Sequence, residues 1–153
     1  MRQHEYEIEL VSQDGQVLKV FNRDAEWFPD GTPVTRLNLE TPISPMVRAV
    51  AVEQETGYLW ILSNLADEEW RSGVGEPTAD RYGLEHTPVL DHSNLYDSIL
   101  EVFDPTGDGA VVATLRLDDY FFALTSDLQL VSYSEDERDV PVIQFYSASL
   151  SVP

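Results

Sequence analysis

Apolar and polar residues alternate with a period of two along much of this chain, which is the pattern of strands with one buried face. The pattern recurs as a strand, a turn and a second strand. It appears in EIELVSQDGQVLKVF (Glu7–Phe21) and ILEVFDPTGDGAVVATLRL (Ile99–Leu117), and as a single strand in VIQFYSASL (Val142–Leu150). Both complete copies turn at Asp-Gly, which favours a tight hairpin because glycine adopts positive φ at little cost. The pattern therefore predicts a series of β-hairpins.

Two further strand pairs are apolar on both faces. They are VRAVAVEQ with YLWILSNL (47–54 and 58–65) and YFFALTS with LQLVSYS (120–126 and 128–134). Strands of this kind are typical of positions that are covered from both sides. We therefore predict that both pairs lie near the centre of the assembly and that Trp60 belongs to the core. In the connector before the first pair, Val34–Glu40 also alternates and could add a strand.

Residues 66–95 form the longest segment without a strand pattern. Glycines and prolines interrupt it, and it carries both His86 and His92. Connections of this length without their own elements are commonly functional loops or disordered segments. We predict a long loop over 66–95.

The order along the chain is outer hairpin, inner hairpin, outer hairpin, inner hairpin and one outer strand. Ile99 and Ile143 open successive outer units and are 143 − 99 = 44 residues apart, which is the spacing of four-stranded propeller blades. This order predicts an all-β fold, a partial β-propeller built of four-stranded antiparallel meander blades. The single domain over 1–153 would hold about two blades plus partial flanking blade strands. An antiparallel β-sandwich is the alternative fold.

Four stretches resemble the six-bladed β-propellers of the NHL-repeat group: Ile8–Phe28, Gly57–Leu62, Leu100–Leu115 and Leu130–Tyr146. The resemblance implies a ring of blades around a channel, with a binding surface on the loops of one rim. Such a ring needs more than about 200 residues, so the resemblance implies a C-terminal portion of about two blades. Missing blades or further copies of the chain would then cover the exposed blade faces.

The charge balance narrows the range of partners. The chain has 28 acidic and nine basic residues, a formal net charge of −19, which opposes approach to a phosphate backbone. We therefore expect no nucleic-acid partner. There is no membrane-length apolar run and no visible signal peptide, so we expect a soluble chain without a membrane span, in an unknown compartment. The absence of cysteine excludes disulfides and thiolate chemistry.

The segment EHTPVLDH (Glu85–His92) contains the most suggestive cluster of chemical groups, because imidazole and carboxylate are ordinary ligands of Zn²⁺. Its spacing matches no ligand signature, however, and Pro88 limits how far the side chains can converge. We predict no metal and no cofactor. A metal-assisted lyase or hydrolase of the propeller type that uses this 85–92 loop is the alternative function.

No catalytic arrangement is recognisable, since there is no G-x-S-x-G and no phosphate-binding glycine loop. We predict no catalytic residues. Arg48 opens an inner strand, and its guanidinium could face the channel mouth and bind an anionic group. Trp27 lies in a connector that could meet a ligand or pack between blades, and Trp70 lies in the long loop. With His86 and His92, these residues are the candidate binding set.

The sequence therefore predicts a non-catalytic binding or interaction scaffold of the β-propeller type. The expected partners are a protein or glycan ligand, and either missing propeller blades or further copies of the chain. Self-association is expected because an open arc of blades exposes apolar faces and an unpaired strand edge.

Overall fold

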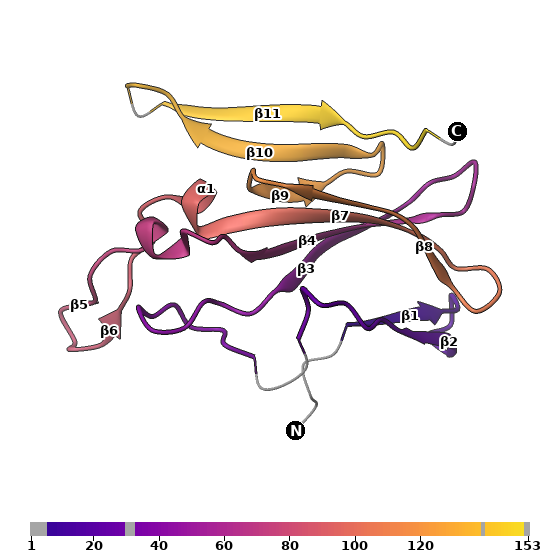
Figure 1. Ribbon diagram of the computed structural model, residues 1–153, viewed down its shortest axis with the longest axis horizontal. Helices are drawn as coiled ribbons and strands as arrows, with labels where there is room; N and C mark the ends of the chain where they lie inside the picture. The colour runs from indigo at the N-terminus through magenta and orange to yellow at the C-terminus, as the bar shows by residue number, and fades with distance from the viewer. Residues whose placement is uncertain (1–5, 30–32, 139, 152–153) are drawn as a thin grey trace.

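The computed structural model describes residues 6–29, 33–138 and 140–151. Its strands form several antiparallel sheets, and the helical elements are short and confined to the connection between β4 and β7 (Figure 1). The strands are β1 (Glu7–Val11), β2 (Val17–Asn22), β3 (Met46–Val52), β4 (Leu59–Ala66), β5 (Thr78–Ala79), β6 (Glu85–His86), β7 (Tyr96–Asp104), β8 (Ala110–Leu117), β9 (Phe121–Leu124), β10 (Gln129–Glu135) and β11 (Pro141–Ser147).

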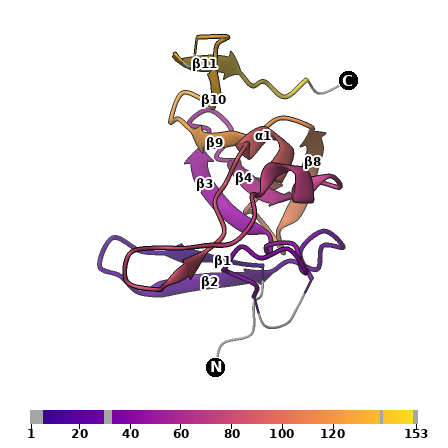
Figure 2. The same ribbon diagram turned by 90° about the vertical axis from the view of Figure 1, so that its left-hand side faces the viewer.

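Within each sheet, the strands lie side by side in their order along the chain. The largest sheet has the order β3-β4-β7-β8, which we call the central sheet. The hairpin β1-β2 lies on one side of it and the three-stranded sheet β11-β10-β9 on the other, as two views show (Figures 1 and 2). The predicted hairpins and the mostly antiparallel β fold are therefore confirmed.

The two middle strands of the central sheet, β4 and β7, are buried on both faces, and successive residues of each strand point to opposite sides. Trp60 and Leu100 belong to a core shared with β9 and β10, whereas Ile61 and Phe103 belong to a core shared with the β1-β2 hairpin. Each large apolar side chain removed from water in this way contributes about 1.5–3 kcal/mol. Packing from both sides explains why β4 and β7 are buried along almost their whole length, and the prediction that Trp60 lies in the core is confirmed.

Glycines close the two predicted hairpin turns. Gly15 has φ +83° in the first, and Gly109 has φ +79° in the second. Gly109 also makes a close approach, since a Cβ at this position would lie 2.6 Å from both the Phe103 and the Phe21 ring. The turn between β7 and β8 therefore needs glycine both for its backbone and for packing against the first hairpin.

Two sequence expectations differ from the structure. Val34–Glu40 is not a strand. Its Asn38 side chain accepts hydrogen bonds from the backbone N–H groups of Glu40 and Thr41, which holds an irregular turn instead. The expected long loop 66–95 contains a 3₁₀ helix (Trp70–Gly73), β5, β6 and the single-turn helix α1 (His92–Leu95). Part of this segment is packed, because a third core gathers Ile43, Trp70, Val74, Leu95 and Tyr96.

Candidate functional site

A β-bulge places Arg48 at one end of the central sheet. The register between β3 and β4 shifts between Val47 and Ala49, so Arg48 is the extra residue. Bulges commonly redirect a side chain. Here the Arg48 Nε donates to the Asn64 Oδ1 at 2.7 Å, and its Nη2 lies 3.4 Å from the Tyr120 hydroxyl.

Two tyrosine rings flank this guanidinium, and the His92 ring stacks on one of them. The Arg48 Cζ lies 5.9 Å from the ring centroids of both Tyr96 and Tyr120, within cation–π range. Tyr120 stacks on Tyr96 at 5.5 Å and on His92 at 5.4 Å between centroids. These side chains come from the start of β3, the end of β4, α1, the start of β7 and the residue before β9. We call the set Arg48, Asn64, His92, Tyr96 and Tyr120 the Arg48 cluster.

Asn64 connects the cluster to the protein interior, where its side chain is fully buried. Its Nδ2 donates to the Ser98 Oγ at 2.9 Å and to the backbone carbonyl of Phe121 at 3.1 Å. The Ser98 Oγ in turn accepts the Phe121 N–H at 2.9 Å. One buried amide therefore joins β4, β7 and β9 and presents its oxygen to Arg48.

The charge of Arg48 has no carboxylate within ion-pair distance among the residues that the structure describes. Its side chain is exposed. Burial raises the pKa of the neighbouring Tyr96 hydroxyl, while the charge of Arg48 lowers that pKa. Arginine nitrogens that remain open to solvent beside aromatic rings suit a planar anionic group such as a carboxylate.

A polar hollow lies beside His92. Its volume is about 420 Å³, and residues 89–93 and 133–135 line it. On the far wall, the Tyr133 hydroxyl donates to the Glu135 Oε1 at 2.5 Å, and this bond raises the pKa of Tyr133. The Arg48 cluster therefore borders an open recess between the α1 segment and the end of β10.

The structure brings Arg48 and His92 together through Tyr120 and places the other expected binding residues elsewhere. Trp27 is half-buried and packs on Tyr6 and Phe28, with centroid distances of 5.3 and 5.6 Å. The other two have different surroundings: Trp70 is buried with Arg71 above its ring, whereas His86 is exposed in β6, 3.3 Å from the Thr78 hydroxyl.

In the described part of the chain, no three side chains of the His, Cys, Asp and Glu types are gathered in a way that could hold a metal ion. Within the same residues, no helix is both long enough and apolar enough to cross a membrane.

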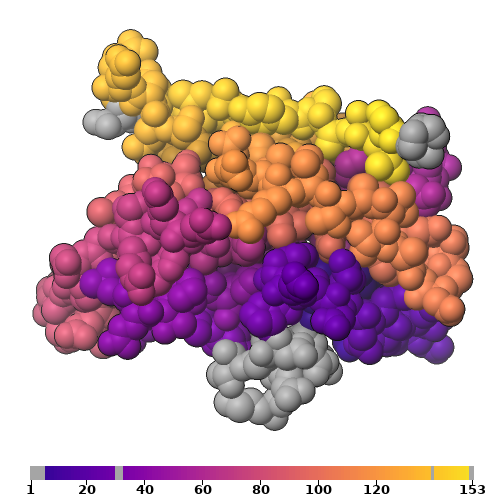
Figure 3. Space-filling model, viewed as in Figure 1, coloured from indigo at the N-terminus to yellow at the C-terminus, as the bar shows by residue number. Residues whose placement is uncertain are grey.

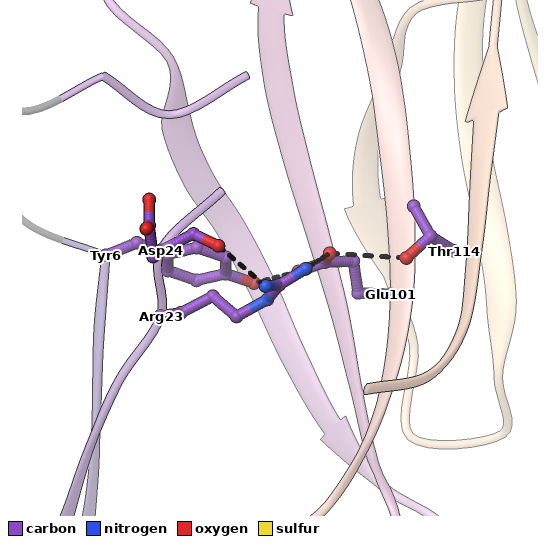
Figure 4. A network of polar contacts seen from close by, with 5 residues as sticks. All are labelled: Tyr6, Arg23, Asp24, Glu101 and Thr114. Carbon is purple, nitrogen blue, oxygen red and sulfur yellow. Dashed lines mark hydrogen bonds and ion pairs between the residues drawn. The ribbon is translucent and has the colours of Figure 1, made fainter. Parts of the chain in front are cut away.

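A second polar network was missed at the sequence level. The Glu101 carboxylate is only 2% exposed and accepts hydrogen bonds from the Tyr6 hydroxyl at 2.9 Å, the Arg23 Nη2 at 3.1 Å and the Thr114 hydroxyl at 3.3 Å (Figure 4). Burial, with the charge of Glu101, raises the pKa of Tyr6, so its hydroxyl stays protonated and donates. This network fastens the first hairpin to the central sheet.

A second buried carboxylate, Asp97, forms an ion pair within the central sheet. Its Oδ2 accepts from the Nε and Nη2 of Arg116 on β8, at 2.9 and 2.5 Å. Burial raises the pKa of Asp97 and the bonds from Arg116 lower it. Asn64, Asp97 and Glu101 are polar residues in strands that are mostly apolar, and that interruption is the sequence signal that could have marked them.

Comparison of the chain with protein-family models, with curated proteins and with solved structures finds no match.

Proposed function

We propose that this chain is a non-catalytic interaction scaffold of the β-propeller type. In this proposal β1-β2 is the outer half of one blade, β3-β4-β7-β8 is a complete blade, and β9-β10-β11 is the inner part of the next. One observation carries the proposal: a four-stranded meander lies with its two faces against two other antiparallel sheets. Stacked meanders of this kind are the building principle of propellers.

The strand order assigns a place to the Arg48 cluster. Blades arranged around an axis would put β3 and β9, the first strands of their sheets, innermost. Arg48 near the start of β3 and Tyr120 just before β9 would then face the mouth of the channel. There, the open guanidinium would contact an anionic group of a protein or glycan partner.

The sheet β11-β10-β9 supports the scaffold proposal through its outer face. Ile143 and Phe145 alternate along β11 and are 50% and 60% exposed. Figure 3 shows the yellow strand along the upper surface of the molecule, where β11 is the end strand of its sheet. An apolar face of this kind is expected to be covered by another blade or by a second copy.

Self-association through this face is the expected result of a light-scattering measurement. The mass should exceed the monomer value of 17.3 kDa and should increase with salt, because salt screens the repulsion between copies of net charge −19. The double variant Ile143→Ser, Phe145→Ser should shift the mass toward the monomer.

The control for this experiment is the double variant Tyr82→Ser, Leu84→Ser, which removes two apolar side chains near β5 and β6 that are even more exposed, at 73% and 68%. It should leave the mass unchanged. A monomer at every salt concentration, or an equal loss of association in the control, would contradict the proposal.

A further inference from the structure

Strand β3 is apolar on both faces, but the described structure covers only one of them. Ala49 and Ala51 face the core beneath β9. On the opposite face, Val47, Val50 and Val52 are 42–54% exposed. A strand that is apolar on both sides is typical of a position with a neighbour on both sides, so β3 lacks a covering element on its valine face.

A hollow of about 360 Å³ lies at this uncovered face. One wall is β1, from Glu7 to Leu10, and the other is formed by apolar side chains of β3 and β4. The first hairpin covers Ile61 and Phe103 further along the same face. The hollow is therefore a gap within a buried layer, where the hairpin ends and the valines of β3 remain exposed.

The free edge of β1 borders the same hollow. Among the described residues, β1 pairs with β2 alone. The Arg23 N–H donates to the Tyr6 carbonyl at 2.8 Å, and bonded and non-bonded pairs alternate along an antiparallel ladder. The backbone N–H and C=O groups of Glu7 and Glu9 therefore point away from β2. They offer an incoming strand its hydrogen bonds.

We propose that this hollow binds a β-hairpin from another polypeptide segment. One strand of the hairpin pairs antiparallel with β1, and the other lies on the valine face of β3. On the opposite face of the same sheet, consecutive strands already cover β3: β9 packs on β3 and β4, and β10 pairs with β9. By analogy, a hairpin is the occupant that we infer for the valine face. The inference rests on the proposed scaffold function and identifies the partner of its first sheet.

The surroundings define the chemistry of this hairpin. Its buried side must be apolar, to cover Val47, Val50 and Leu59. Its exposed positions beside Glu7 and Glu9 should be basic, since these carboxylates belong to a chain of net charge −19. The occupant is thus a hairpin that has an apolar buried face and carries basic residues near Glu7 and Glu9.

A synthetic hairpin tests this inference on the intact chain. The probe is a head-to-tail cyclised, fluorescently labelled peptide with the sequence of residues 119–135, carrying Asp119→Lys and Glu135→Lys. Cyclisation removes most of the ordering cost. We expect saturable one-to-one binding in fluorescence anisotropy. Val50→Asp should weaken it about tenfold or more, because it places a charge in the apolar contact. Leu115→Asp on β8, where the side chain is equally exposed at 54%, should leave it unchanged.

A second pair of variants tests strand pairing itself. Glu9→Pro removes a backbone N–H that points to the free edge and leaves the β1-β2 ladder intact. Glu9→Ala removes the same charge but keeps the N–H. We expect Glu9→Pro to weaken peptide binding about fivefold to tenfold relative to Glu9→Ala. Circular dichroism of both variants confirms that the fold is retained.

The outcomes separate this inference from the scaffold proposal. No binding to the wild-type chain, or binding that Val50→Asp leaves unchanged, would overturn the hairpin site, even if light scattering shows self-association through β11. Equal binding by Glu9→Pro and Glu9→Ala would overturn strand pairing with β1. Self-association that Val50→Asp and Glu9→Pro abolish in the absence of peptide would assign the hollow to a second copy and overturn the proposed occupant.

Discussion

Replacing Arg23 with alanine is expected to lower the free energy of unfolding by about 3 kcal/mol. The substitution leaves the Glu101 carboxylate buried without its cation, 78 residues along the chain from Arg23. The remaining donors, Tyr6 and Thr114, are neutral and cannot offset the cost of a buried charge. The loss should be visible as a lower urea midpoint with an unchanged slope.

Arg138→Ala is the matched control for this experiment. Arg138 also pairs with a carboxylate, Asp136, at 3.0 Å, but its side chain is 82% exposed. Its removal should change the free energy of unfolding by no more than about 0.5 kcal/mol. Equal effects of the two substitutions would show that the pair with Glu101 does not hold the first hairpin on the central sheet.

Asn64→Leu is expected to lower the free energy of unfolding by about 2–4 kcal/mol. Leucine has a similar volume but leaves the carbonyl of Phe121 and the hydroxyl of Ser98 without the amide that bonds them. The hydrogen bond that joins β4 to β9 through the fully buried Asn64 side chain is then lost. Arg48 also loses the oxygen that fixes its Nε.

Urea denaturation measures the change in stability, and the NMR signal of the Arg48 Nε–H reports the change in the Arg48 cluster. Asn94→Leu is the control, since Asn94 lies exposed in α1. It should leave both measurements unchanged. An Asn64→Leu variant as stable as wild type, with an unaltered Arg48 signal, would refute the role given to this amide.

Much of the fold could be predicted because its signals are local. The Asp-Gly turns before Gln16 and Ala110 fixed two hairpins, and alternation within five to nine residues marked the strands. The apolar run of YLWIL indicated that β4 is covered from both sides, as Trp60 and Ile61 are. The structure of segment 66–95 was harder to predict, because its elements are two to four residues long and carry almost no periodicity.

The site could be predicted only in part, because its geometry is set by long-range register. Arg48 faces its aromatic neighbours through a bulge, and a bulge depends on how β3 pairs with β4. Tyr120 lies 72 residues from Arg48 along the chain, and no spacing rule links them. Glu101 could be singled out as a charge in an apolar strand, but its partner Arg23 follows only from the stacking of the first hairpin on the sheet.

The central claim is that the sheet β3-β4-β7-β8 separates the other two sheets, and nuclear Overhauser contacts between side chains test it most directly. We expect contacts of the Phe103 ring with Phe21 on one face, and of the Asn64 side-chain amide with Phe121 on the other. Direct contacts between Phe21 and Leu130, which belong to the two different cores, would contradict the account.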